Sequence, residues 1–228
     1  QQQQQQQHVS FGEADFLPED PNSPKAVYRQ MVESRGEMEW RVFCSEGGNE
    51  YFVPVTQERI DGYSTEIVRA VMAGETIDAI TKMTPDNATT NILMLCNKFG
   101  ESVLHTACRY GRVDIIRHFL QLEEGGTLWC CDDYGRTPLH DACWTTTPNF
   151  ELITLLLEQA PDLMVMGDIR GCIPLEYVPK KYWDLWKDFL RENQSSNWLL
   201  PRTVLHQRQT SRNPADEIVP SPVLVGPG

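Results

Sequence analysis

Two histidine–cysteine pairs are the residues in this chain whose types and spacing could bind a metal. His105 precedes Cys108 by three residues, and His140 precedes Cys143 by the same interval. Residues three apart lie on one face of a helix, and two imidazoles with two thiolates form a common zinc ligand set. Zinc binding would require all four side chains to converge as a tetrahedron, so it depends on the elements that carry the two pairs.

The sequence contains none of the short motifs that mark common catalytic sites. H-E-x-x-H, G-x-S-x-G, the P-loop and G-x-G-x-x-G are all missing. Ser102 lies near His105, but no third group is in place to orient that histidine as a base. Adjacent Cys130 and Cys131 are a poor redox pair, because a disulfide between neighbours is strained. We therefore predict no catalytic residue and no cofactor.

Both histidine–cysteine pairs lie in segments that recur along the chain. Gly100–Cys108 aligns with Gly135–Cys143 and with Gly171–Val178, so the glycines are 35 and 36 residues apart. A second marker, a leucine that opens a mainly apolar stretch, recurs every 35 residues at Leu93, Leu128 and Leu163. Two markers in register indicate a structural repeat.

Within one repeat, the residues predict a turn followed by two short helices. Gly135 suits a turn because glycine adopts positive φ without strain, and Thr137-Pro138 suits a helix start. Leu139, Ala142 and Cys143 then form one apolar face. A second, more apolar helix is predicted over residues 150–157, and Pro161 stops it.

The segment Thr137-Pro138-Leu139-His140-Asp141-Ala142 resembles the T-P-L-H-x-A signature of the ankyrin repeat. The first copy has Ser102-Val103 in place of Thr-Pro, and the third has Glu176 in place of His. The resemblance covers about residues 60–191. Within it, residues 64–83 are interpreted as a capping repeat without a hairpin, and residues 183–190 as the closing cap. One departure is the link Trp144–Asn149, which is longer than its counterpart and lacks glycine.

The resemblance implies an all-α fold, a short ankyrin-repeat solenoid of about three repeats plus caps. Its helix-turn-helix units are joined by hairpin-like turns. In this family the signature histidine bonds to neighbouring backbone and the small residue after alanine is buried. We therefore expect His105, His140, Cys108 and Cys143 to be structural and predict no metal site.

Outside the repeats, the composition changes at both ends. Residues 1–26, with seven leading glutamines, are predicted to be disordered, and residues 27–60 form a less defined extension. In that extension we expect a short helix over 28–34. Residues 40–44 and 51–53 are predicted to form either a pair of strands, with a turn at Gly47-Gly48, or an adapted edge. Residues 61–191 are the repeat domain, and residues 192–228 are predicted to be a disordered tail.

The charge and the cysteines limit the partners and the compartment. With 32 acidic and 20 basic residues, the net charge is -12, which disfavours nucleic acid and anionic membranes and favours a basic protein surface. No apolar run approaches the roughly 20 residues that span a bilayer. Seven cysteines without a C-x-x-C pair indicate reduced thiols in an intracellular protein, cytoplasmic or nuclear. The oligomeric state stays open.

The resemblance also implies which residues bind a partner protein. Turn tips and the exposed ends of the first helices line a concave face in this family, and aromatic and arginine side chains recur there, as in interface hot spots. Carried onto this chain, the positions are Lys98, Phe99, Glu101, Arg109, Tyr110, Asp133, Tyr134, Arg136, Trp144, Thr145, Ile169 and Arg170. Three functions remain open: an adaptor or scaffold, a nuclear regulator, which only the glutamine tract and acidity favour, and the non-catalytic part of a larger enzyme.

Overall fold

The structure, a computed structural model, describes residues 19–35, 40, 42–44, 52–83, 91–121 and 127–202. The α-helices are α1 (Pro24–Ser34), α2 (Gln57–Asp61), α3 (Thr65–Ala73), α4 (Ile77–Thr81), α5 (Val103–Arg109), α6 (Val113–Leu120), α7 (Pro138–Cys143), α8 (Phe150–Gln159) and α9 (Trp183–Glu192). Single turns of 3-10 helix are η1 (Ile92–Met94), η2 (Pro161–Val165), η3 (Pro174–Tyr177) and η4 (Lys180–Tyr182). The strands β1 (Phe43–Cys44) and β2 (Met166–Gly167) form a small parallel sheet.

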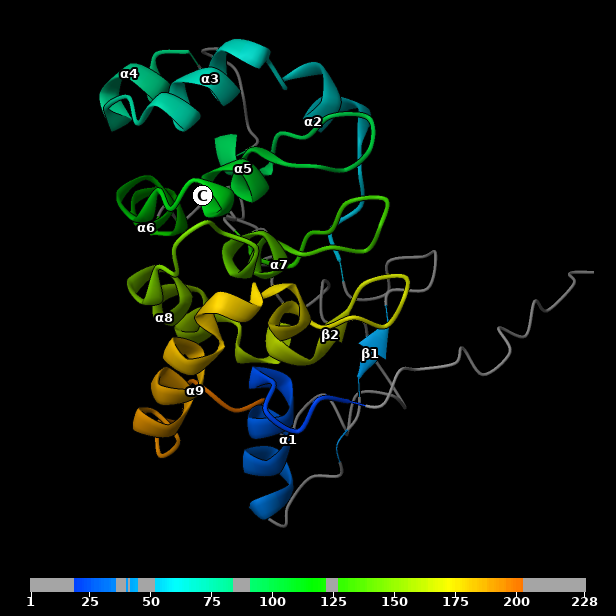
Figure 1. Cartoon of the computed structure of the whole chain (residues 1–228). Coiled ribbons are helices and arrows are strands. Elements are labelled where there is room, and N and C mark those ends of the chain that lie inside the picture. Colours follow the sequence, from blue (N-terminus) through cyan, green and yellow to red (C-terminus); the bar gives the residue numbers. More distant parts are fainter. Residues whose placement is uncertain are drawn as a thin grey trace, which may run out of the picture.

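The helices stack in antiparallel pairs, one pair per repeat. α3, α5, α7 and η3 follow one another in contact as an inner layer, while α6 and α8 pack beside them as an outer layer. Figure 1 shows this arrangement, with the turns between repeats projecting from the side opposite α6 and α8. The predicted capping repeat at 64–83 forms the pair α3 and α4 at one end of the stack.

Local residue types set where these helices begin and end. The hydroxyls of Ser64 and Ser102 accept hydrogen bonds from the backbone N–H three residues later, which caps α3 and α5. Gly111, with φ of 66°, follows α5 in the left-handed conformation that glycine adopts readily. α7 has no such glycine; it ends at Cys143 with Trp144 as its C-cap, so its link to α8 takes a different path.

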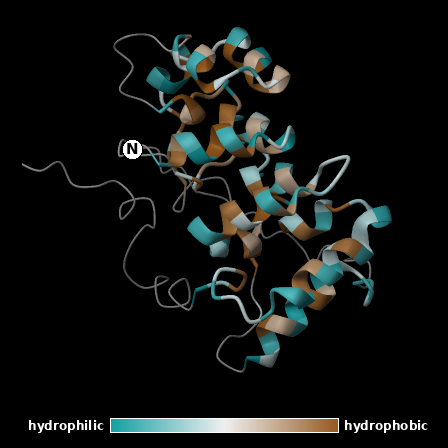
Figure 2. Cartoon of the chain, turned by 90° about the vertical axis from the view of Figure 1, so that its left-hand side faces the viewer, coloured by the Kyte–Doolittle hydropathy of each residue, from teal (hydrophilic) through white to brown (hydrophobic). Residues whose placement is uncertain are grey.

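The core lies between the two layers and is made of the apolar faces predicted from the repeat. Leu104, Ala107, Leu139 and Ala142 are all at most 1% exposed. The two small alanines let α5 and α7 approach closely, and these two helices share the largest inter-helix contact in the stack. Figure 2 shows hydrophobic and hydrophilic residues on the same helices, as expected of amphipathic elements that cover one core.

The third repeat is reduced, and α9 closes the stack. Its first helix is the single turn η3, because Pro179 disfavours a helical conformation at Val178 and prevents continuation. The predicted closing cap is the helix α9, whose Trp186, Phe189 and Leu190 are buried.

Where the structure describes the N-terminal extension, it pairs with the repeats, so of the two predicted alternatives the pair of strands is wrong. β1 pairs with β2 in parallel, with Phe43 opposite Met166. Val53 does not join β1 but donates its N–H to the carbonyl oxygen of Trp129 at 2.8 Å. A Cβ on Gly167 would lie 2.8 Å from Val42, so only glycine lets the extension approach this closely. The turn predicted at Gly47-Gly48 lies outside the described residues.

Residues 42–44 and 52–59, here named the strap, contact each of the three repeats in turn. After β1 and Val53, the strap reaches Arg59, whose Nε donates to the carbonyl oxygen of Met94 at 2.6 Å. The carbonyl oxygen of Arg59 in turn accepts from the N–H of Cys96 at 3.2 Å. The strap therefore runs from the third repeat back to the first.

Helix α1 precedes the strap and covers the opposite end of the stack, against α9 and η3. It begins at Pro24, inside the segment predicted to be disordered, because the Ser23 hydroxyl accepts from the N–H of Ala26 and caps it. The folded part also extends past residue 191, since Leu199 and Leu200 are buried. Both predicted boundaries are thus displaced; residues 1–18 and 203–228 lie outside the described part of the chain.

Candidate protein-binding surface

Each turn between repeats is built around one polar side chain that binds the turn's own backbone. The Oδ1 atoms of Asn97, Asp132 and Asp168 accept hydrogen bonds of 2.8–3.0 Å from the N–H two residues later. A glycine with positive φ then follows, at Gly100, Gly135 and Gly171. This geometry fixes the turn and leaves the residues between the polar side chain and the glycine at its tip.

The three tips are joined to one another by main-chain hydrogen bonds. The N–H of Asp133 donates to the carbonyl oxygen of Phe99 at 2.8 Å, and the N–H of Ile169 donates to that of Tyr134 at 2.9 Å. We name this row the fingertip ridge, comprising residues 98–99, 133–134 and 169–170. Phe99, Tyr134 and Ile169 are 52%, 57% and 52% exposed, so a rigid backbone presents large hydrophobic side chains to solvent.

The cationic side chains on and beside the ridge contact aromatic or acidic side chains of the same chain. The ammonium group of Lys98 lies 4.9 Å from the ring centroid of Phe99, and the guanidinium of Arg136 lies 5.1 Å from that of Tyr134. Arg136 also pairs with Asp132 at 2.6 Å. Arg170 pairs in the same way with Asp168 at 2.8 Å. Arg136 and Arg170 therefore shape the tips as well as facing solvent.

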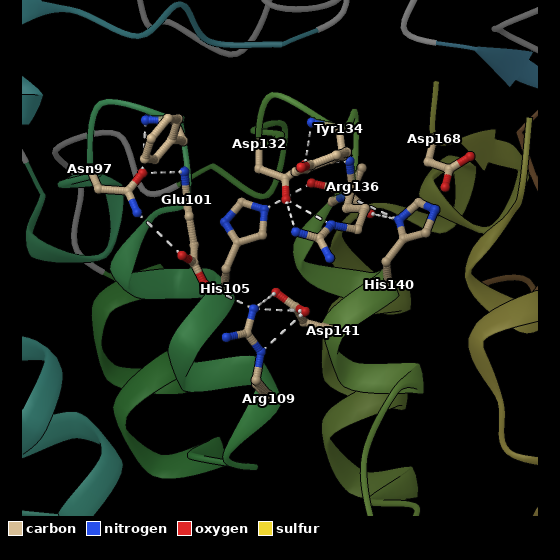
Figure 3. Close-up of polar contacts among 12 residues, drawn as sticks. Asn97, Glu101, His105, Arg109, Asp132, Tyr134, Arg136, His140, Asp141 and Asp168 are labelled. Atoms are coloured by element: carbon tan, nitrogen blue, oxygen red, sulfur yellow. Dashed lines mark hydrogen bonds and ion pairs between the residues drawn. The ribbon is translucent and has the colours of Figure 1, made fainter. Parts of the chain in front are cut away.

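Below the ridge, Arg109 joins two repeats through two carboxylates (Figure 3). Its Nη2 lies 2.9 Å from Glu101 Oε1 in its own repeat and 3.1 Å from Asp141 Oδ1 in the next. Burial raises the pKa of the Asp141 carboxyl, and the charge of Arg109 opposes that rise. With two carboxylates around one guanidinium, this cluster carries a net negative charge.

A hollow of about 810 Å³ opens beside this cluster, between the ends of α5 and α7. Its lining is Arg109, Tyr110, Gly111, Trp144, Thr145, Thr146, Thr147, Pro148, Asn149 and Phe150. The link after α7 forms one wall and is fixed by its own contacts. The Thr145 hydroxyl donates to the carbonyl oxygen of Thr147 at 2.9 Å, and the Tyr182 hydroxyl donates to that of Thr146.

The two signature histidines connect consecutive repeats through backbone contacts. Nδ1 of His105 accepts from the N–H of Ser102 at 3.1 Å, so Nε2 carries the proton and donates to the carbonyl oxygen of Arg136 at 2.9 Å. His140 makes the equivalent contacts with Thr137 and Cys172, both at 3.0 Å. Neither nitrogen of either ring keeps a lone pair for a metal. In the described part of the chain, no three His, Cys, Asp or Glu side chains gather as a metal site.

Ser102, Cys108 and Cys143 are buried beside these histidines and have structural roles. Ser102 is fully buried with its hydroxyl 2.8 Å from His105 Nδ1, where it caps α5 and cannot reach a substrate. Burial raises the pKa of the Cys108 and Cys143 thiols, which disfavours the reactive thiolate. These groups hold the repeats together, and the geometry gives them no catalytic arrangement.

Turns, paired helices and histidine bridges recurring at one period mark a known repeat, and a comparison with protein families agrees. Residues 63–166 match the family described as ankyrin repeats (3 copies). This part of the chain is an ankyrin-repeat domain. Ankyrin repeats generally bind other proteins and are typically non-catalytic. No match was found among curated proteins. No helix among the described residues is long and apolar enough to cross a membrane.

The ankyrin domain places the twelve predicted residues in two groups. Those of the first group lie on or beside the fingertip ridge: Lys98, Phe99, Glu101, Asp133, Tyr134, Arg136, Ile169 and Arg170. The others line the hollow: Arg109, Tyr110, Trp144 and Thr145. Sequence reasoning missed the remaining wall of the hollow, residues 146–150, although the long glycine-free link was a visible signal. It also missed Asp141, whose place in a signature position hides its ion pair with Arg109.

Proposed function

We propose that this ankyrin domain belongs to a non-catalytic adaptor or scaffold that holds a partner protein across the fingertip ridge and the hollow. The observation that carries the proposal is the ridge itself. Phe99, Tyr134 and Ile169 are more than half exposed on a backbone that two main-chain hydrogen bonds tie together. A rigid surface with exposed aromatic groups binds with little loss of conformational entropy, and such groups dominate interface hot spots.

Two further features support a partner with a basic surface and an intracellular location. The net charge of -12 favours encounter with a basic surface, because long-range attraction raises association rates. Cys96, Cys108, Cys130, Cys143 and Cys172 are thiols outside any disulfide, which supports an intracellular setting.

The test is affinity capture from native lysate with three proteins whose folding is checked by circular dichroism. These are the unchanged chain, a Tyr110→Ala, Tyr134→Ala, Trp144→Ala variant, and a control carrying Met83→Ala and Leu185→Ala. Met83 and Leu185 are 41% and 52% exposed but lie outside the ridge and the hollow. We expect one partner to be enriched by the unchanged chain and the control and lost with the triple variant. Equal capture by all three would exclude this surface.

A further inference from the structure

We propose that the hollow between Tyr110 and Trp144 receives an arginine or lysine side chain of the partner protein. This inference rests on the proposed function and specifies the partner's chemistry at one place on the surface. Its basis is a difference between the aromatic rings of the ridge and those of the hollow, together with the charge around the hollow.

Exposed aromatic rings on this domain differ in whether their own chain supplies a cation. Among the described residues the exposed rings are those of Phe99, Tyr110, Tyr134 and Trp144. The two ridge rings lie beside Lys98 and Arg136, with cation-to-centroid distances of 4.9 and 5.1 Å. In the same part of the chain, no lysine or arginine lies over the rings at positions 110 and 144. Trp144 meets the ring of Tyr177 in a T-shaped contact, with centroids 6.3 Å apart, and more than two fifths of each hollow ring stays exposed to a cation from elsewhere.

The charge around the hollow favours that cation. Arg109 lines the hollow, but its guanidinium is shared between Glu101 and Asp141. Nε and Nη2 both donate to Asp141, at 3.3 and 3.1 Å, which turns the guanidinium towards its own carboxylates. The three groups together carry one negative charge. An incoming cation thus meets two aromatic rings and a guanidinium whose charge is offset by Glu101 and Asp141, which lie outside the lining, on a protein with a strongly negative total charge.

The dimensions and polar groups of the hollow also suit a basic side chain with its flanking backbone. Its volume of about 810 Å³ lies within the usual range for ligand sites. Thr146 and Thr147 are exposed in its wall and can bond to a guanidinium or to peptide groups. Tryptophan is the strongest aromatic partner for a cation, and the planar guanidinium of arginine stacks on such rings. Arginine is therefore expected to bind better than lysine.

The test uses defined peptides rather than an unknown partner. The probes are acetylated, amidated nonapeptides of glycine and serine whose central residue is Arg, Lys, Gln, Leu or Glu. Binding is followed by the backbone N–H signals of Thr145, Thr146 and Thr147 in 15N-labelled protein, which line the hollow and are present in every variant. We expect the Arg and Lys peptides to bind about five- to tenfold more tightly than the Gln and Leu peptides, as one or two cation–π contacts allow. The Glu peptide should bind most weakly.

Single substitutions test whether the preference for basic peptides depends on the rings and the charge of the hollow. Trp144→Leu and Tyr110→Leu replace exposed rings and should remove the preference for basic peptides. Glu101→Gln keeps the oxygen that accepts from Asn97 but removes one negative charge, so it should weaken the preference. Leu185→Ala is the control, because Leu185 is 52% exposed but lies outside the hollow and the ridge, and it should leave peptide binding unchanged.

Two results would overturn the inference. One is equal or tighter binding of the Leu or Gln peptides, or no binding of the Arg peptide beyond that of the Glu peptide. The other is a loss of preference in Leu185→Ala as large as in Trp144→Leu. If either occurs while partner capture still depends on Tyr110 and Trp144, the protein-binding function stands and only the basic occupant is wrong. If the preference for basic peptides fails and partner capture does not depend on Tyr110 and Trp144 either, the proposed function is wrong as well.

Discussion

The hydroxyl of Tyr28 donates a 2.9 Å hydrogen bond to the carbonyl oxygen of Leu199, 171 residues along the chain. Repeat proteins are normally held by contacts between neighbouring units alone. Here α1 covers the far end of the stack and the strap returns across the three repeats to α2. Residues before the first repeat thus help to hold the last one.

Tyr28→Phe should lower the free energy of unfolding by about 1–2 kcal/mol, because it leaves a buried carbonyl oxygen without its donor. Urea denaturation followed by circular dichroism measures the change. Arg29→Gln is the control on the same helix, since the ion pairs of Arg29 with Glu19 and Glu33 are exposed and contribute little. Equal midpoints for the two variants would show that α1 does not hold the C-terminal end.

Arg59 should fasten the strap to the first repeat. The residue is 5% exposed, and besides its bond to Met94 its Nη1 donates to the carbonyl oxygens of Val53 and Pro54. Arg59→Met leaves these carbonyl oxygens unpaired, which should loosen the strap and speed exchange of the Val53 amide hydrogen about tenfold or more. Hydrogen exchange measured by NMR gives the rate.

The matched control is Arg69→Met, which removes an exposed arginine from α3. It should leave the exchange at Val53 unchanged. If Arg59→Met and Arg69→Met give the same rate, the hydrogen bonds of Arg59 are not what holds the strap in place.

The repeat core could be predicted from the sequence because its signals are local. Thr137, Pro138 and the apolar spacing after them define α7 within a few residues, and the 35-residue period locates the neighbouring copies. The strap carries no such signal. β1 is two residues long and pairs with residues 123 positions away, so neither alternation nor a turn reveals the partner.

The candidate site was predictable only in part for a related reason. The exposure of Tyr134 and Trp144 follows from their positions at a turn tip and a helix end, which the repeat pattern defines. Charge pairing across repeats depends on three-dimensional stacking. Arg109 was predicted as a partner-binding residue; that it lies between Glu101 and Asp141 follows only from the relative placement of α5 and α7.

Trp186 should be a main stabilising residue of the closing cap. It is 1% exposed, and its ring centroid lies 5.3 Å from the ring centroid of Phe150 and 5.9 Å from that of Phe189. Trp186→Ala would leave a large cavity and should lower the free energy of unfolding by about 3–5 kcal/mol, and the Tm by about 10 °C. Leu185→Ala, at a neighbouring exposed position, should change the Tm by little. A melt of Trp186→Ala like that of Leu185→Ala would contradict the capping role.

Stability should also depend on pH through His140. Burial lowers the pKa of its imidazole from 6.5 to about 4, although the bond to the Cys172 carbonyl oxygen opposes the shift. Between these two values the unfolded chain binds a proton at His140 and the folded chain does not. Stability from this group is therefore full above pH 6.5 and falls as the pH drops towards 4, by about 3 kcal/mol in all.

Urea denaturation at pH 7.5, 6.5, 5.5 and 4.5 measures this dependence, and His140→Gln isolates it from the other titrating groups. Glutamine can still bond to the N–H of Thr137 at the start of α7, but it does not titrate. The variant should be less stable than the unchanged chain at pH 7.5, and the difference should shrink as the pH falls. A difference that stays constant across the four values would mean that His140 titrates alike in the folded and unfolded chains, and the hydrogen bonds described for it could then not keep it neutral.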